Sequence, residues 1–523
     1  MLAPVIALAL WASAWSMVST RHNMLSWADS AVYLGTADEI RHWHGPTVPS
    51  TFAWDGYQPG VALAFDGHVP SSHYPPGYPA ALAAVSTLGR GERGAARWID
   101  VVCVGLNVLL LGVLTARLTA YRSALVAVLP AFLVVFFSDS TIVFGWLQLH
   151  IAIASEPLFI LLTNGALLAA CTAVGPPSPR TRRAIALATA FAAAAFLTRY
   201  AGAAVVLTVG LAVGVLVGGS LVHRSRRTLV VSCIAVGPML LYLLWSAALG
   251  GQGTRTLAYH PARPSEIVDS FGRFLLPPSW PTTVRALGVA VVAAVVAVAC
   301  FWIPRRVREY WTNDRVRVQQ LIAVMFIVLY VATVFATQTW LDRSTAFDAR
   351  LFAPVRGVVY AVTVAVAYRL LAPYLRAKTA ATVVGLLCAA LVFTGWSTAR
   401  TVIETGAGPA PVRTAAEEAI ARLPDDATIV TSVPDIVYLA SGRRSFVLPS
   451  PLVYSTGEPN HAYAADLSRW AHQLTTRHSY AFFETTPFLA VNSATATDLR
   501  RYVPLRLIVQ SGDQSLYEIV RSA

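Results

Sequence analysis

Four charged residues stand beside long apolar segments and could do chemistry at a membrane boundary: Asp29, Glu156, Arg199 and Arg350. Asp29 follows the first apolar segment, residues 1–19, and opens a polar segment that runs to about residue 75. Holding a carboxylate close to lipid is costly, so such a group usually has a partner or a function. A carboxylate can accept a proton from a hydroxyl, and an arginine fork can bind a phosphate. The four residues therefore suggest acid–base chemistry on a phosphate-bearing ligand.

Glu156 stands in the sequence Ala154-Ser155-Glu156-Pro157, where an apolar segment begins. One interpretation is structural: Ser155 would cap a helix, Pro157 would occupy its first turn, and the helix dipole would favour the carboxylate. The alternative is functional, because Asp29 is expected at the same membrane level. The pairing of the two acids favours the functional interpretation.

The arginines have two interpretations as well. Arg199 ends an apolar run, and Arg350 precedes the sequence Leu351-Phe352-Ala353-Pro354. Either guanidinium could simply extend to the membrane surface. Both are expected on the outer side, however, against the usual charge bias of membrane proteins, which favours an anionic partner such as a phosphate or pyrophosphate. A weaker candidate for the same role is the outer segment with Arg255, His260 and Arg263.

A third motif closes the first polar segment: Ser72-His73-Tyr74-Pro75-Pro76-Gly77-Tyr78-Pro79. The prolines predict a rigid, extended approach to the next apolar stretch. Aromatic residues at this depth fit an interfacial belt, and that is one interpretation. The other places His73 or Tyr74 beside a lipid-linked substrate.

The elements that must position these residues are membrane helices. The chain has 523 residues, of which 56% are hydrophobic and 13% charged, whereas soluble proteins carry about 25% charge. Repeated apolar runs of roughly 18–22 residues predict a polytopic α-helical membrane protein with about 11–13 transmembrane helices. The net charge of +13 does not indicate a nucleic-acid binder, because much of it lies in short loops between apolar runs. We expect helices near residues 1–19, 97–116, 123–138, 152–173, 184–198, 201–221, 229–249, 284–303, 319–338, 351–371 and 379–398.

Charge placement predicts the orientation. With a cytoplasmic N-terminus, the clustered arginines fall in cytoplasmic loops, as the positive-inside rule requires. These loops are 117–122, 180–183, 224–227, 305–317 and 376–378. The long first loop, 20–76, and the tail are then extracytoplasmic. The stretch 77–90 is too short to span comfortably and predicts a re-entrant or interfacial helix.

Residues 1–398 are expected to form the membrane domain, and residues 399–523 a small extracytoplasmic α/β domain. The tail alternates predicted strands and helices: strands near 427–430, 445–448 and 479–483, helices near 435–441 and 464–476, and a hairpin of 507–509 with 516–519. It has no glycine-rich phosphate fingerprint. The five cysteines, Cys103, Cys171, Cys233, Cys300 and Cys388, all lie in apolar runs, so we expect no disulfide and no thiol metal site.

The motifs together resemble the C-type glycosyltransferase superfamily, polytopic enzymes that use polyprenyl-phosphate sugars. The pattern is most similar to the branch with protein mannosyltransferases and the aminoarabinose transferase of lipid A. The matching segments are Asp29 with Tyr33, Tyr74-Pro75-Pro76, Ser155-Glu156-Pro157-Leu158, Leu197-Thr198-Arg199-Tyr200, and Arg350-Leu351-Phe352-Ala353-Pro354. Many members carry two adjacent acids in the first loop. Here Ser30 follows Asp29, and Asp38-Glu39 is a rival acidic pair.

The resemblance implies that a sugar moves from a polyprenyl-phosphate donor to a glycan, glycolipid or protein acceptor at the outer face of the membrane. Arginine and alanine dominate the composition, which suggests a GC-rich bacterial genome, so we expect a bacterial plasma membrane. Asp29 would be the catalytic base, supported by Glu156. The implied substrate-binding residues are Tyr33, His73, Tyr74, Arg199, Tyr200, Arg255, His260 and Arg350. No cofactor is expected, although a divalent cation stays open.

Two other functions fit the composition. A transporter or flippase of lipid-linked sugars would need polar residues spread through the bilayer, whereas stretches such as 190–197 and 289–300 are almost purely apolar. A catalytically inactive scaffold, whose tail binds a partner, is the third possibility.

Overall fold

A computed structural model shows how the predicted elements assemble. It describes residues 3–49, 68–71, 73–89, 91–119, 124–136, 146–174, 178–216, 220–249, 259, 272–273, 281–291, 294, 315–341, 349–371, 377–405, 413–453, 458–486 and 493–521. The candidate residues Arg255, His260 and Arg263 lie outside these ranges.

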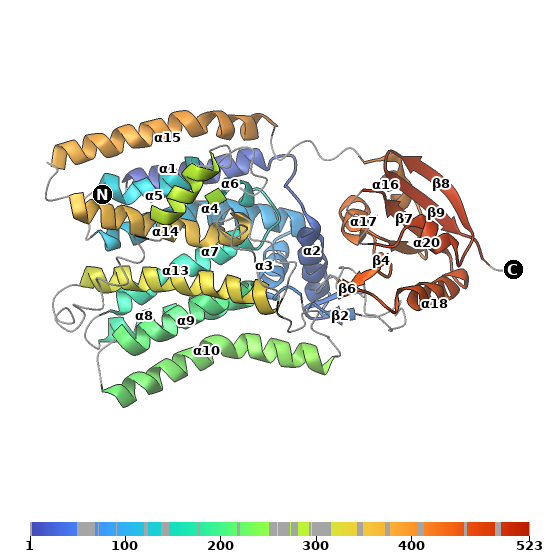
Figure 1. The fold of residues 1–523 in the computed structure, drawn as a ribbon, viewed down its shortest axis with the longest axis horizontal. Coiled ribbons are helices and arrows are strands. Elements are labelled where there is room, and N and C mark those ends of the chain that lie inside the picture. The colour runs from blue at the N-terminus through green and yellow to red at the C-terminus, as the bar shows by residue number, and fades with distance from the viewer. Residues whose placement is uncertain are drawn as a thin grey trace.

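A bundle of apolar helices makes up the first part of the chain, and its long members run side by side (Figure 1). They are α1 (Ala3–Ser19), α4 (Gly91–Leu118), α5 (Ala124–Phe136), α7 (Glu156–Ala173), α8 (Pro179–Thr198), α9 (Ala203–Leu211), α10 (Leu221–Ala248), α13 (Arg315–Trp340), α14 (Ala349–Leu371) and α15 (Ala377–Thr405). Among the described residues, five helices are long and apolar enough to cross a membrane. The expected polytopic α-helical architecture is therefore confirmed.

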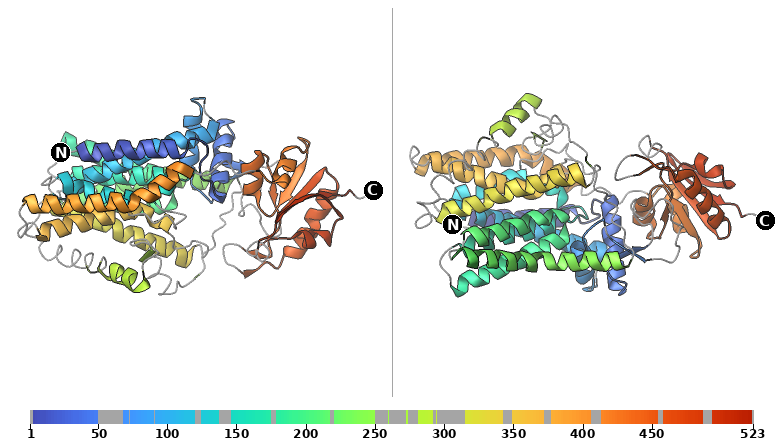
Figure 2. Two further views of the ribbon diagram at one scale, coloured as in Figure 1. Left: turned by 90° about the horizontal axis from the view of Figure 1, so that it is seen from above. Right: turned by 60° about the horizontal axis from the view of Figure 1, so that its bottom comes forward.

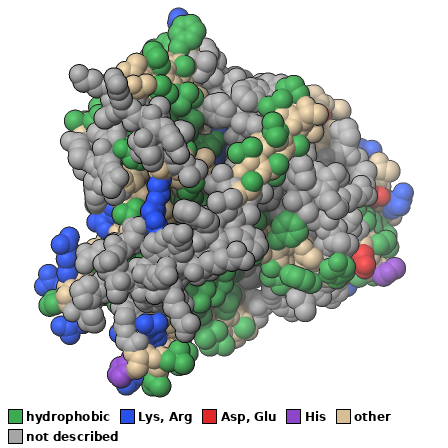
Figure 3. Space-filling view, turned by 60° about the vertical axis from the view of Figure 1, so that its left-hand side comes forward, with side chains coloured by type: hydrophobic (Ala, Val, Ile, Leu, Met, Phe, Trp, Pro, Cys, Tyr) green, Lys and Arg blue, Asp and Glu red, His purple; other side chains and the backbone are tan. Residues whose placement is uncertain are grey.

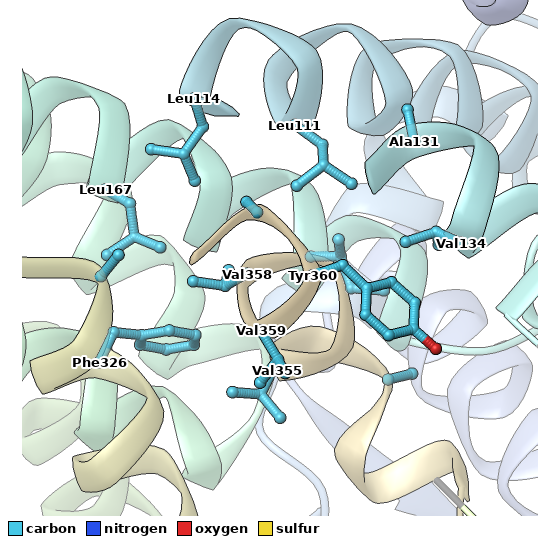
Figure 4. Close-up of a cluster of buried hydrophobic side chains, with 14 of the residues drawn as sticks. Leu111, Leu114, Ala131, Val134, Leu167, Phe326, Val355, Val358, Val359 and Tyr360 are labelled. Carbon is cyan, nitrogen blue, oxygen red and sulfur yellow. The ribbon is translucent and has the colours of Figure 1, made fainter. Parts of the chain in front are cut away.

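The bundle core is aliphatic and aromatic. Leu111 and Leu114 of α4, Leu167 of α7, Phe326 of α13 and Val358 of α14 pack against one another (Figure 4). All five side chains are buried. The core holds the helices in register, so the residues at their ends have fixed positions.

Two arginine clusters that were expected in loops lie in helices instead. Arg180–Arg183 belongs to α8, and Arg224–Arg227 belongs to α10. In each case the helix begins before the apolar run does, because a serine caps it. The Ser178 hydroxyl accepts a hydrogen bond from the backbone N–H of Thr181, and the Ser220 hydroxyl accepts one from that of His223. Both helices begin at the left-hand end of the bundle in Figure 1, so this charge still lies at one end. Several blue side chains are also visible at the left of the face drawn in Figure 3.

The opposite end is covered by two short helices. The first loop, predicted as a long polar segment, contains α2 (Ala28–Arg41), which lies across the helix ends (Figure 1). The stretch predicted as re-entrant or interfacial forms α3 (Gly77–Ser86), a helix of 10 residues. At 1.5 Å per residue α3 is about 15 Å long, roughly half of a bilayer core. Between α2 and α3, two short strands pair antiparallel: β1 (Thr47–Pro49) and β2 (His68–Pro70).

The C-terminal region is an α/β unit. Its five strands are β3 (Thr428–Thr431), β4 (Phe446–Val447), β7 (Ser479–Glu484), β8 (Leu505–Ser511) and β9 (Gln514–Ile519), in the order β4-β3-β7-β9-β8. Its helices are α16 (Ala415–Ala421), α17 (Pro434–Ser441), α18 (Tyr463–Thr475) and α20 (Ala496–Arg500). A separate short pair, β5 (Leu452–Val453) with β6 (Glu458–Pro459), lies beside them. The sheet contains the strands predicted from alternation, and α15 continues through the boundary expected at residue 398.

The α/β unit lies against the α2 end of the bundle (Figures 1 and 2). Tyr438 and Leu439 of α17 pack on Ala31 and Val32 of α2. The guanidinium of Arg93 in α4 donates to the carbonyl oxygen of Leu439 at 2.6 Å. The two parts of the chain therefore enclose the α2 region between them.

Gly77 lets α3 approach the end of α8 closely. A Cβ at this position would lie 2.7 Å from the backbone carbon and oxygen of Leu197. We expect Gly77→Ala to lower the free energy of unfolding by about 1–3 kcal/mol, because backbone cannot yield as a flexible side chain can. Thermal unfolding in detergent measures the loss. Gly385→Ala in α15 is the control, since a Cβ there meets nothing within 4 Å. Equal melting temperatures for the two variants would contradict the close packing.

Candidate active site

Four charged side chains from four separate segments meet at the α2 end of the bundle. Asp29 lies in the first turn of α2, Glu156 begins α7, Arg199 directly follows α8, and Arg350 lies at the start of α14. Each residue stands at an end of its helix, so the helix packing described above sets where its side chain can reach. The structure thus brings together the two candidate carboxylates and two of the candidate arginines.

Arg350 connects the two carboxylates. Its Nη2 donates to Oδ2 of Asp29, and its Nε donates to Oε1 of Glu156. Arg199 also contacts Oε1 of Glu156, through Nη1 at 2.5 Å. The Glu156 side chain is fully buried, whereas Asp29, Arg199 and Arg350 retain 18%, 18% and 14% exposure. Two negative and two positive groups therefore form one neutral cluster. Three of its four side chains are partly exposed to solvent.

Ser155 decides between the two interpretations of Glu156. Its side chain does not cap α7. Instead, its hydroxyl accepts a hydrogen bond from Nη1 of Arg199 at 2.9 Å and lies 3.0 Å from the hydroxyl of Tyr33. The serine side-chain cap expected by the structural alternative is therefore wrong, whereas its other two features are present: Pro157 lies in the first turn of α7, and Glu156 is the acid of that turn. The Ser155 hydroxyl and the Glu156 carboxylate both hold Arg199 in place.

Asp29 also receives a hydrogen bond from Tyr74, whose hydroxyl donates to Oδ1 at 2.8 Å. Burial alone would raise the pKa of Asp29, but the charges of Arg350 and Arg199 and the Tyr74 hydrogen bond outweigh it and lower the pKa. Asp29 is therefore ionised at neutral pH. Burial and the nearby carboxylate charge raise the pKa of Tyr74, so this phenol stays protonated and remains a donor.

An aromatic wall surrounds the charges. The Tyr33 ring lies edge-on to the rings of Tyr74 and Tyr78, with centroids 5.1 Å and 5.0 Å away. The Arg350 guanidinium lies over the Trp27 ring at 5.3 Å. His73 packs edge-on against Tyr74 at 4.5 Å, and Tyr200, next to Arg199, is half-buried. Aromatic rings beside partly exposed arginines suit a ligand that has both a sugar ring and an anionic group.

The backbone preceding α2 is fastened to the backbone preceding α7. Leu25 and Ala152 form an isolated parallel bridge, with N–H···O distances of 2.9 Å on both sides. The Ser30 hydroxyl extends this connection, because it donates to the carbonyl of Ile153 at 2.8 Å and accepts from the N–H of Trp27 at 2.9 Å. Ser30, the residue that follows Asp29, thus positions this carboxylate next to Glu156.

The rival acidic pair lies elsewhere. Asp38 and Glu39 are at the C-terminal end of α2, about 15 Å along the helix from Asp29 at 1.5 Å per residue. Asp38 is exposed, and Glu39 pairs with other groups. Neither carboxylate takes part in the four-residue cluster.

Sequence reasoning missed three contributors to this region: Trp27, Tyr78 and Asp100. Asp100 lies inside α4, is fully buried, and neither carboxylate oxygen has a hydrogen-bond partner among the described residues. An acid within an apolar run was the available signal, because intramembrane carboxylates are rare and usually functional. Tyr78 belonged to the proline-rich motif but was not singled out.

The charge cluster predicts an unequal response to two glutamate substitutions. Glu156→Ala leaves two guanidinium groups facing each other in a buried site, so we expect a loss of about 3–5 kcal/mol in unfolding free energy. Denaturant or thermal unfolding measures it. Glu418→Ala removes an exposed partner of Arg422 at 3.1 Å and should change stability little. A Glu156→Ala variant as stable as Glu418→Ala would contradict the buried pairing.

Comparisons with known proteins give a match in structure alone. No family model and no curated protein matches the sequence. ArnT from Cupriavidus metallidurans in the apo state matches with a TM-score of 0.58 at 12% identity, covering 99% of this chain and 97% of that chain. ArnT bound to undecaprenyl phosphate matches with the same score and coverage at 11% identity. The archaeal oligosaccharyltransferase AglB from Archaeoglobus fulgidus, in complex with an inhibitory peptide and a dolichol-phosphate, matches at 0.54 and 12% identity, covering 99% of this chain and 74% of that chain. The chain therefore shares its fold with ArnT and AglB.

Proposed function

We propose that this protein is an integral membrane glycosyltransferase. It moves a hexose or pentose from a polyprenyl-phosphate donor to a glycan, glycolipid or protein acceptor of the cell envelope. The observation that carries the proposal is the cluster of Asp29, Glu156, Arg199 and Arg350 at one end of the helix bundle. The match in fold to ArnT with bound undecaprenyl phosphate supports it.

The two arginines suit the leaving phosphate. When the bond from the sugar to the phosphate breaks, negative charge grows on the phosphate oxygens, and positive groups already in position lower the energy of that step. Arg350 uses Nε and one Nη2 donor for the carboxylates, and a guanidinium has five N–H donors in all. Its remaining donors, with Arg199, can bind phosphate oxygens bidentately. This stabilisation needs no resident metal ion.

Asp29 suits the acceptor. The attacking hydroxyl must lose a proton, and an ionised carboxylate can receive it. The nearby guanidinium lowers the pKa of Asp29 and weakens it as a base. A donor phosphate that draws Arg350 toward itself would relieve this effect and raise the pKa. In this mechanism Asp29 becomes a competent base when the donor is in place, and Glu156 keeps Arg199 oriented.

Charge asymmetry supports an outward-facing site. Arginines gather at the beginnings of α8 and α10, and the four-residue cluster lies at the other end of the bundle, beside the α/β unit (Figure 1). Under the positive-inside rule the arginine-rich end is cytoplasmic. The cluster and the α/β unit are then extracytoplasmic, where α17 covers α2 and could help to hold the acceptor.

Asp29→Asn should abolish sugar transfer in membranes or liposomes supplied with a polyprenyl-phosphate sugar, because the amide cannot accept the proton. We expect a loss of about 10²–10⁴-fold in turnover, the usual contribution of general base catalysis. Asp38→Asn is the matched control on the same helix and should retain activity. Retained turnover in Asp29→Asn removes this carboxylate from the mechanism. Movement of lipid-linked sugar across liposomes without transfer would support the flippase alternative instead.

Arg199→Ala should weaken binding of the donor, because a charge-assisted contact to the phosphate is lost. A contact of about 1.5–3 kcal/mol corresponds to an increase in donor Kd of roughly 10–150-fold. Titration of a polyprenyl-phosphate lipid in detergent measures it. Arg117→Ala is the control, since this arginine donates to the Thr172 hydroxyl at 2.7 Å away from the cluster. Unchanged donor affinity in Arg199→Ala would show that Arg199 does not bind the phosphate.

A further inference from the structure

A second group of chemically active side chains lies at the far end of α2. Glu39 is near the last turn of α2, His44 is in the turn that follows, and His68 begins β2. Nδ1 of His44 lies 2.6 Å from Oε2 of Glu39, and Nδ1 of His68 lies 2.9 Å from the same oxygen. The two imidazole rings are 4.4 Å apart between centroids. Three donor atoms from three segments therefore converge on one point.

The local backbone is shaped to bring these residues together. Trp43 and Gly45 have φ values of 64° and 77°, in the left-handed region, so the chain reverses immediately after α2 and returns His44 to Glu39. The β1–β2 register pairs Pro49 with His68, which places the start of β2 beside the same turn. A left-handed conformation at tryptophan is costly for a side chain of its size, and such strain is typical of functional positions.

Glu39 has the properties of an anchoring ligand rather than of a surface acid. Its side chain is 2% exposed, whereas those of His44 and His68 are 47% and 34% exposed. Arg444 of the α/β unit donates to the other carboxylate oxygen, Oε1, at 2.6 Å. This bond fixes the plane of the Glu39 carboxylate and leaves Oε2 directed at the two imidazoles. Metal-binding carboxylates are commonly oriented in this way by a hydrogen bond from a residue that does not itself bind the metal.

The donor set identifies the class of ion. One carboxylate oxygen and two imidazole nitrogens suit zinc, whereas calcium and magnesium prefer oxygen ligands alone. Zinc bonds of about 2.0–2.2 Å put two donors on the same ion roughly 3.3 Å apart. Here the three ligand atoms all lie within 4.8 Å of one another, so small side-chain rotations would enclose an ion. Partial exposure of the histidines gives the ion a path from solvent and room for water as a further ligand.

We propose that Glu39, His44 and His68 bind one zinc ion that fastens the end of α2 to the β1–β2 pair. Through Arg444, the same carboxylate is connected to the α/β unit, so the ion also supports the docking of that unit. The site lies about 15 Å along α2 from Asp29, too far for the ion to contact that carboxylate, so the ion would act on it only by fixing the position of the helix. Its existence does not depend on the proposed function.

Zinc binding by the full-length protein in detergent, with any affinity tag removed, tests the proposal. The protein is stripped with a chelator, given zinc chloride, desalted and analysed for metal content. We expect about one tightly held zinc per chain and a higher melting temperature with zinc than with chelator. Cobalt chloride in place of zinc should give the visible absorption of a low-coordinate site. A wild-type protein that retains no stoichiometric metal and shows no shift in melting temperature would overturn the proposal, whatever the variants do.

Variants separate this site from adventitious binding. Glu39→Gln, His44→Ala and His68→Ala should each weaken zinc affinity by more than about tenfold. Arg444→Ala should weaken it by about 10–100-fold, because the residue that orients the Glu39 carboxylate is lost. His42→Ala is the matched control, because its ring lies 6.4 Å from that of His44 but outside the group of three ligands. Equal zinc affinity in wild type and the His44→Ala/His68→Ala double variant would show that the metal binds elsewhere. Zinc binding in a protein without transferase activity would leave this proposal intact and count against the proposed function alone.

Discussion

The burial of the Glu156 carboxylate is the constraint on which the outer end of the bundle depends. A fully buried charge is tolerated only when it is paired and hydrogen-bonded, because desolvation otherwise costs several kcal/mol. Arg199 and Arg350 both contact one oxygen of this carboxylate. They come from the end of α8 and the start of α14, so those helices must reach the same depth as the start of α7. Asp29 accepts a hydrogen bond from Nη2 of Arg350 and is thereby held in the same arrangement.

Several uncharged residues near these helix ends help to hold the charged groups together. Leu25 and Ala152 join two loop segments through backbone hydrogen bonds, and Ser30 adds a side-chain bond between them. Gly202 brings backbone closer than a Cβ would allow at the turn that presents Arg199, since an added Cβ would lie 2.5 Å from the backbone of Phe196. Apolar packing stabilises the bundle, and these local contacts fix the positions of the charged side chains at its end.

Much of this arrangement could be predicted from the sequence. Apolar runs indicated the membrane helices, and alternation indicated the strands of the α/β unit, because both depend on local periodicity. The acids and arginines at helix ends were identified since charges beside lipid are conspicuous. The pairings were not predictable. That Arg350 would contact both acids, or that Glu39 would meet His68, depends on contacts between segments that are distant in sequence.

Helix α2 was missed, because its mixed polar composition resembles a loop. The serine caps of α8 and α10 moved two helix starts, since capping overrides the onset of hydrophobicity.

The neutrality of the four-residue cluster has a consequence for turnover. A polyprenyl-phosphate sugar is a phosphodiester with one negative charge, whereas the lipid phosphate left after transfer is a monoester with a charge approaching −2 at neutral pH. On the proposed reaction Asp29 takes up the acceptor's proton, so the charge that the phosphate gains is lost from this carboxylate, and the two arginines face the same total negative charge before and after transfer. While Asp29 is protonated, its former partner Arg350 is free to bind the spent carrier. Loss of that proton restores the ion pair between Asp29 and Arg350 and thereby favours departure of the carrier into the bilayer.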